Sequence, residues 1–341
     1  MAQPLTRSET DAAIANHGPM LQLHPDEQYV NCSIEWMLSH STLIDTKDKT
    51  KNIVHPRPDQ LPQGPKQGTQ YYLEVEDSAK PGNFSTAKAY VNAFWQKGLT
   101  YTDLQFWFFS AYNGHGTALF GSLVEDKVDH QADINLAPLG EHWADWEYAA
   151  IRIDNASKEM IGIMLSEHGK NIFFDKAAVA KQFKMVNGEH PVVYSSLNGH
   201  ANFPGVGTNF SEHHQVLGKP AGLDFNIVNA TADGGLQFDC STRYQVVAAD
   251  WLTGTPGAYD IPAWVGYPYR WGPEGTTIHM KLTTLSEFIK AALRPKDFFE
   301  VLVLDDPITL LASELLHVFV KADINGAAAP ATQAPWTGHY S

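Results

Sequence analysis

The chain is poor in cysteine and in positive charge. Cys32 and Cys240 are the only cysteines in 341 residues, so a disulfide framework is excluded and two free, buried thiols are the favoured interpretation. The 24 Lys and Arg residues stand against 38 Asp and Glu residues, which gives a net charge of −14. Such a charge repels phosphate backbones and anionic lipid surfaces, so we expect no nucleic-acid partner.

Long apolar runs and several catalytic motifs are also missing. No stretch approaches the roughly 18 to 20 apolar residues that a membrane-spanning helix needs, and the first residues lack the apolar core of a signal peptide. We expect a soluble protein, cytoplasmic as given and secreted if a leader has been removed. No G-x-S-x-G elbow, phosphate-binding glycine loop, dinucleotide fingerprint, H-E-x-x-H or paired C-x-x-C occurs.

Short strands dominate what is present. Runs rich in β-branched and aromatic residues, bounded by Gly, Asn, Asp or Pro, are Phe106–Tyr112, Tyr148–Ile153, Met160–Ser166, Pro191–Leu197 and Tyr244–Ala249. The second and third of these runs read as a hairpin that turns at Asp154 and Asn155. With 43% hydrophobic residues for a core, this pattern predicts a mainly β protein, an antiparallel β-sandwich.

Three segments have helical spacing and predict peripheral and C-terminal helices. They are Thr86–Gln96, Thr283–Leu293 and Thr309–Ala322. From residue 325 onward the chain is small, Pro-containing and aperiodic, which is typical of a flexible tail. We therefore predict a single domain over residues 1–324 and a flexible C-terminal tail over 325–341.

One predicted strand begins with charges, in the stretch Gly140–Ile153, GEHWADWEYAAIRI. Residues two apart in a strand share a face, so Asp145 and Glu147 point the same way while Trp146 points the other. Two neighbouring carboxylates repel unless a cation lies between them, and a bend after Gly140 allows His142 to join them. The alternative is that both acids lie on a solvent-exposed face.

The candidate metal ligands are therefore His142, Asp145 and Glu147. Imidazole and carboxylate ligands suit a divalent cation, and an oxygen-rich set favours Ca, Mg or Mn over Zn. Upstream acids and histidines, among them Asp129, His130 and Asp133, could each fold back as a further ligand.

Two histidines follow directly after predicted strands. His168 and His200 lie beside glycines, where the loops of a sandwich gather at one rim. We predict at least one imidazole within roughly 3 to 6 Å of the metal ligands, as a ligand, a hydrogen-bond donor or an acid-base group. The alternative is that each caps a turn. A third polar group, His24, Asp26 and Glu27, is interpreted as a structural turn.

Four long segments resemble the vacuolar protein sorting-associated protein 62 family, the plant-type domain of unknown function 946. They occur in the family's order over about residues 15 to 275 and are His24–Leu38, Gly140–Ile153, Pro191–Gly207 and Ile261–Pro273. The resemblance implies no particular chemistry. Sequence after Pro273 departs from the family pattern. The last segment, AWVGYPYRWGP, predicts a packed aromatic corner or a surface that stacks on a sugar or lipid headgroup.

The hexapeptide His142–Glu147 is also similar to the histidine-x-histidine-Asp-Trp-Glu motif of the necrosis- and ethylene-inducing toxin-like proteins. That resemblance implies a β-sandwich with a divalent cation held by the residues that match His142, Asp145 and Glu147, and by an upstream aspartate for which Asp133 is the best-spaced candidate. Ala144 replaces the middle histidine. The toxin-like family binds sphingolipid headgroups on plant cells through its metal face.

Two functions follow as expectations. The first is a metal-binding protein that docks a small-molecule, glycan or lipid-headgroup ligand through its rim, in defence or as a toxin. The alternative is a metal-dependent hydrolase, in which His168 or His200 moves protons. A purely structural metal is the third possibility.

Overall fold

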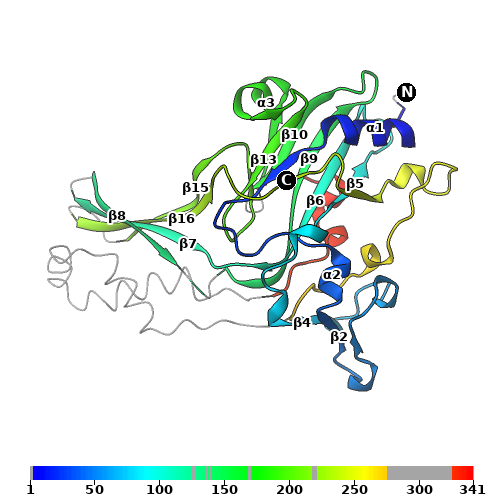
Figure 1. Ribbon diagram of the computed structural model, residues 1–341, viewed down its shortest axis with the longest axis horizontal. Helices are drawn as coiled ribbons and strands as arrows, with labels where there is room; N and C mark the ends of the chain where they lie inside the picture. The colour runs from blue at the N-terminus through cyan, green and yellow to red at the C-terminus, as the bar shows by residue number, and fades with distance from the viewer. Residues whose placement is uncertain are drawn as a thin grey trace.

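Strands make up most of the regular structure. The computed structural model describes residues 3–124, 127–135, 137, 140–167, 170–216, 221–274 and 325–340, and within these ranges it has 18 strands and three α-helices. The predicted mainly β fold is confirmed (Figure 1).

A six-stranded sheet in the order β11-β10-β9-β6-β5-β18 forms the centre of the fold. All its neighbours are antiparallel except β18 and β5, which run parallel. Its strands are β5 (Ala89–Phe94), β6 (Tyr101–Asn113), β9 (His142–Asp154), β10 (Met160–Glu167), β11 (Lys170–Asp175) and β18 (Tyr244–Ala248). The predicted hairpin is the connection between β9 and β10.

A second sheet packs on one face of the central sheet and completes the sandwich. Leu21, Val193 and Phe238 from this sheet share a buried apolar cluster with Phe106 and Ile151 of the central one. Its strands are β1 (Met20–Gln22), β12 (Met185–Val186), β13 (His190–Ser195), β14 (Asn202–Phe203) and β17 (Gln237–Asp239). Helices α1 (Arg7–His17) and α3 (Lys176–Gln182) contribute buried residues to the same cluster.

The opposite face of the central sheet is covered by short elements and aromatic side chains. The elements are α2 (Ile34–Leu38), β2 (Ser41–Asp45), β3 (Ile53–Val54) and β4 (Tyr71–Val75). Trp264 and Trp271 are fully buried here and pack against Trp146 of β9, with ring centroids 5.6 and 5.7 Å away. The aromatic part of Ile261–Pro273 is therefore a packed corner, which is one of the two structures predicted for it.

A four-stranded antiparallel sheet projects from the body as an arm (Figure 1). It contains β7 (Thr117–Val124), β8 (Lys127–Asn135), β15 (Gly207–Val216) and β16 (Ala221–Thr231). Its strands continue from the same end of the sandwich at which β6 ends and β9 begins.

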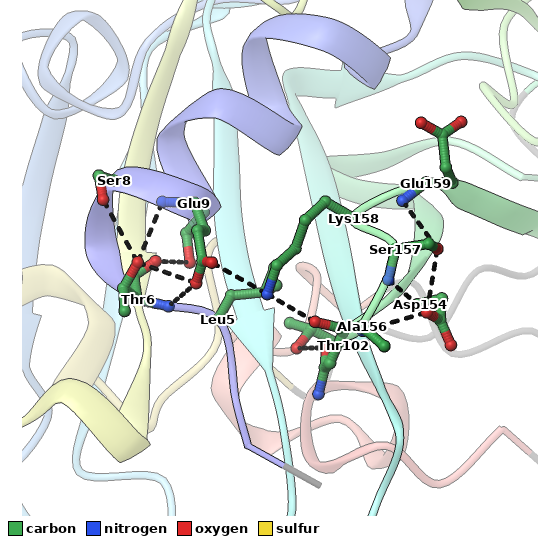
Figure 2. A network of polar contacts seen from close by, with 12 residues as sticks. Leu5, Thr6, Ser8, Glu9, Thr102, Asp154, Ala156, Ser157, Lys158 and Glu159 are labelled. Carbon is green, nitrogen blue, oxygen red and sulfur yellow. Dashed lines mark hydrogen bonds and ion pairs between the residues drawn. The ribbon is translucent and has the colours of Figure 1, made fainter.

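Polar contacts fasten α1 to the β9–β10 hairpin (Figure 2). Glu9 accepts a hydrogen bond from the Thr6 amide at 2.8 Å, which completes a capping box, and its other oxygen lies 3.0 Å from Lys158 Nζ. Lys158 also donates to the carbonyl of Asn155, whose side chain accepts from Thr102 on β6. The helix start and the hairpin turn are thus held by one network.

The predicted helix over Thr86–Gln96 is wrong, because this segment forms strand β5. Ala89, Val91 and Ala93 face one apolar cluster and Tyr90 faces the other, so the strand is buried on both sides. A segment that is apolar on both faces has no alternation to mark it as a strand, and pairing with β6 and β18 overrides its helical propensity.

The two predicted C-terminal helices lie outside the described residues, and the single-domain boundaries stay a prediction. Residues 325–340, for which we expected a flexible tail, instead pack on the central sheet. Trp336 lies 5.7 Å from the Trp107 ring, and Gln105 donates to Pro335 and to the Tyr340 hydroxyl. A buried side-chain amide of the sheet thereby gains hydrogen-bond partners. The composition of the segment gives no sign of such contacts with distant strands.

Cys32 and Cys240 are free and buried, as expected. Within the described ranges, the helices lack the length and apolar character needed to cross a membrane.

We predict that Trp336→Ala lowers the free energy of unfolding by about 2 kcal/mol, less than a fully buried tryptophan because the side chain is only partly buried. Urea denaturation of both proteins measures the change. His339→Ala, at an exposed position of the same segment, is the control and should leave the midpoint unaltered. Equal midpoints for Trp336→Ala and the parent protein would contradict the packed segment.

Candidate functional site

An enclosed polar space lies between the two sheets of the sandwich, and we call it the polar chamber. It is narrow, since the side chains leave no room for a water molecule. Its lining residues are Leu21, Asn31, Phe108, Ser110, Asp145, Glu147, Ser195, His200 and Asn202.

Strand β9 supplies both carboxylates of the chamber. Asp145 and Glu147 face it, whereas Trp146 and Tyr148 face the aromatic cluster on the other side. The expected alternation is therefore present, but the acidic face is turned into the molecule. Asp145 is only 8% exposed and Glu147 is only partly exposed, which excludes a fully solvent-exposed acidic face.

A backbone kink separates His142 from these carboxylates. Ala144 has a φ of 54°, a left-handed conformation that is unfavourable for a residue with a Cβ. His142 Nδ1 lies 2.8 Å from the Ala144 carbonyl oxygen. Because a carbonyl only accepts, Nδ1 carries a proton and the neutral ring has its lone pair on Nε2.

His200 enters the chamber from the loop between β13 and β14. This loop is tight, with left-handed residues at Asn198 (φ 65°) and His200 (φ 53°) and hydrogen bonds from Gly199 N to Leu197 O and from His200 N to Ser196 O. Such a loop fixes the direction of its side chains. The His200 residue is 4% exposed.

Two carboxylates flank the His200 ring. Nδ1 lies 2.9 Å from Asp145 Oδ2, and Nε2 lies 3.6 Å from Glu27 Oε2. Glu27 is itself held by backbone amides, with Tyr29 N at 2.8 Å and Asn198 N at 2.7 Å. The result is a buried row, Glu27–His200–Asp145, which we call the ion triad.

The triad shifts the protonation of its members. Burial by itself lowers the pKa of His200, but the charge of Glu27 and the contacts with Asp145 outweigh it and raise that pKa to about 10. Burial opposes ionisation of Glu27, yet the facing imidazolium lowers its pKa to about 2. At neutral pH the ring is therefore an imidazolium, and this internal cation lies beside the carboxylates where we expected a metal.

Glu147 forms no ion pair among the described residues. Burial, and next the charge of Asp145, raise its pKa well above the ordinary value, while the charge of His200 and a hydrogen bond with Ser166 oppose the shift. Among the described residues its buried Oε2 has no hydrogen-bond partner. The environment therefore favours the neutral acid as the chamber stands.

Two asparagines add unpaired oxygens to the chamber. Asn31 Nδ2 donates to the Phe109 carbonyl at 3.3 Å, and Asn202 Nδ2 donates to the Tyr148 carbonyl at 3.1 Å. These contacts fix the amide orientation, because only nitrogen can donate to a carbonyl. Both Oδ1 atoms are buried and, within the described part of the chain, have no hydrogen-bond partner.

The structure brings together only part of the predicted metal set. Asp145 and Glu147 share the chamber and His142 lies outside its lining. Asp133 belongs to β8, opposite Leu119, but its side chain lies outside the described residues, as does His168. Over the described ranges, no three His, Cys, Asp or Glu side chains are grouped as metal ligands, so the cation stays a prediction.

The sequence offered a signal for the residues that local spacing missed. Glu27 and Asn31 belong to one of the four segments that carry the family resemblance, and Asn202 belongs to another, together with His200, which the sequence did predict near the acids. Together with β9, three of these segments meet at the chamber. The reading of Glu27 as part of a structural turn did not account for its contact with His200.

A family model described as "Vacuolar protein sorting-associated protein 62" matches residues 3–315. Two solved structures are similar to the chain, each at 13% identity. One is Necrosis and Ethylene inducing Protein 2 from the causal agent of cocoa's Witches Broom disease, with a TM-score of 0.32 over 69% of this chain and 72% of that one. The other is NLPPya in complex with mannosamine, with a TM-score of 0.35 over 86% and 95%. No curated protein matches significantly.

We predict that His200→Gln lowers the free energy of unfolding by about 3–5 kcal/mol at pH 6, because it leaves two buried carboxylates without their cation. Because the pKa of His200 is higher in the folded protein than in the unfolded chain, its charge stabilises the fold fully below the unfolded pKa of 6.5. This stabilisation is lost as the pH rises towards the folded pKa of about 10. Urea denaturation between pH 6 and 10 should thus show parent and variant converging. The raised pKa of Glu147 also makes the fold less stable as the pH rises, but it does so equally in the parent protein and in the variant. A difference that stays constant across this range would contradict a charged His200.

Proposed function

The chain belongs to the vacuolar protein sorting-associated protein 62 family, and from that premise we propose that it binds a divalent cation in the polar chamber and docks a headgroup or glycan at the adjoining edge. The family resemblance expected from the four segments is confirmed. Because membership of this family by itself implies no particular chemistry for the chain, the proposal rests on the chamber.

The observation that carries the proposal is the set of unpaired oxygens. Asn31 Oδ1, Asn202 Oδ1 and Glu147 Oε2 are buried, belong to residues that line the same space, and lack hydrogen-bond partners within the described residues. A buried polar atom left without a partner costs about 1–3 kcal/mol, and three in one small space are unusual. A cation among them would satisfy all three.

The donor set fits a hard cation. Two carboxylates, Asp145 and Glu147, and two amide oxygens, from Asn31 and Asn202, are the oxygen ligands that calcium, magnesium and manganese prefer. When bound, such a cation supplies the positive charge that favours the ionised form of Glu147. The soft thiolate and neutral imidazole donors typical of zinc are not among these four.

His200 is a positioning residue in this arrangement. Its charged ring has no lone pair for a metal, so it does not ligate in the protonated state. Instead it donates to Asp145 Oδ2 and fixes the direction of that carboxylate. Glu27 balances the charge of the ring on the far side.

Aromatic side chains at the neighbouring edge support docking. Ser110 of β6 pairs with Asp145 of β9 in the ladder, and further out, beyond the kink at Ala144, Tyr112 pairs with Trp143. Aromatic rings with polar tips suit hydroxylated ligands that have an apolar face. The alternative hydrolase gains no support from the geometry, because the chamber has no space for a substrate beside its acids.

We predict that calcium or magnesium raises the melting temperature of the parent protein and that Glu147→Gln removes this shift. A ligand at 100 times its Kd stabilises by about 2.7 kcal/mol, which a thermal melt detects. The melts are run with added cation and with chelator, and metal content is measured by elemental analysis.

His142→Ala distinguishes the ligand set predicted from the sequence, which includes His142, from the chamber residues, which do not include it. We expect His142→Ala to keep the cation response. Glu159→Gln, on the exposed hairpin turn, is the matched carboxylate control. An identical response of the parent and of Glu147→Gln to cation and chelator would exclude a cation at the chamber.

A further inference from the structure

A small pocket opens beside the start of β9, outside the polar chamber. Its volume is about 200 Å³. Its lining residues are Lys80, Tyr112, Glu141, His142, Trp143, Pro273 and Gly326.

Two aromatic rings of this pocket form a corner. The centroids of Tyr112 and Trp143 lie 5.1 Å apart, and the ring planes meet at 74°. The ammonium of Lys80 lies in front of both rings, with Nζ 4.9 Å from the Tyr112 centroid and 5.5 Å from the Trp143 centroid. Both distances are within the range of a cation–π interaction, so one positive group is shared by two ring faces.

Acidic side chains increase the negative potential around this corner. Asp77 Oδ1 lies 2.9 Å from Lys80 Nζ, and Glu141 accepts a hydrogen bond of 2.9 Å from the Tyr112 hydroxyl. The corner thus combines two π faces with two carboxyl groups. These are the features that recognise an organic cation.

We infer that this corner binds the quaternary ammonium group of a choline-type headgroup and that Lys80 is a displaceable internal substitute for it. The Lys80 side chain is 37% exposed and its ion partner Asp77 is 86% exposed, so little holds the ammonium in place. A lysine ammonium is strongly hydrated. A quaternary ammonium has no N–H to offer water, and therefore favours the aromatic faces more strongly.

A second lysine–aromatic pair shows what a purely structural contact looks like. Lys88 Nζ lies 5.8 Å from the Tyr90 centroid, but the Tyr90 side chain is fully buried. Lys88 also forms an ion pair with Glu35 at 3.4 Å, and its cation–π contact is with the Tyr90 ring. It therefore serves as a matched control for Lys80.

The inference deepens the proposed function, on which it rests for the docking role, but it does not require the cation of the chamber. The test is an NMR titration of the choline and tetramethylammonium methyl resonances with parent protein, Lys80→Ala and Lys88→Ala, each with chelator and with added calcium. 3,3-Dimethyl-1-butanol, the uncharged analogue of choline, is titrated in parallel. Phosphocholine and phosphatidylcholine vesicles distinguish a free headgroup from a lipid surface.

We expect Lys80→Ala to bind tetramethylammonium at least threefold more tightly than the parent, because the internal competitor is gone, and Lys88→Ala to match the parent. In the Lys80→Ala background, Trp143→Leu should reduce binding at least fivefold while thermal melts report a folded protein. The uncharged analogue should bind at least tenfold more weakly than choline, a comparison that needs no variant.

Equal affinity of choline and its uncharged analogue, or of parent and Lys80→Ala, would overturn the inference. If the ammonium ligands still bind in the presence of chelator, and the melting temperature does not respond to calcium or magnesium, the chamber proposal is refuted and this inference stands. A cation response without ammonium binding would refute this inference alone.

Discussion

The imidazolium of His200, buried between two carboxylates, is the interaction on which this end of the molecule depends. It donates to Asp145 on the central sheet and faces Glu27 in a loop after the first strand of the second sheet. Glu27 is held in turn by the amides of Tyr29 and Asn198, the second of which belongs to the His200 loop. Each member therefore needs the other two, because a buried charge without a partner is strongly destabilising.

The charges of the triad explain why the rest of the chamber stays unpaired. The positive charge of His200 is in contact with Glu27 and Asp145, and its effect on Glu147 is outweighed by burial and by the charge of Asp145, so the neutral form of Glu147 is favoured. The amide nitrogens of Asn31 and Asn202 are already used by the sheet. A core built only for stability replaces such groups with apolar ones at little or no loss, and their presence is therefore the basis of the proposed cation.

Sequence alone predicted the alternation of the charged strand, and with it that Asp145 and Glu147 share one face. It failed for β5, whose two buried faces hide the strand period, and for the tail, whose partners are amides of distant strands. It grouped His142 with the acids by assuming a bend after Gly140, whereas the structure places His142 outside the chamber lining and a left-handed residue, Ala144, between them. Long-range partners such as Glu27 follow from the fold and not from local spacing.

The first rungs of β9 provide two different environments for positive charge. The outer rung pairs Tyr112 with Trp143 and offers ring faces, whose diffuse negative potential suits a large, weakly hydrated cation. The rung on the inner side of Ala144 brings Asp145 beside Ser110 and offers oxygens, which suit a small, hard one. The residue between the two rungs is Ala144, whose left-handed backbone redirects the strand there. On both proposals the charges at this strand entry serve to attract cations, and the acidic chain as a whole reinforces that attraction.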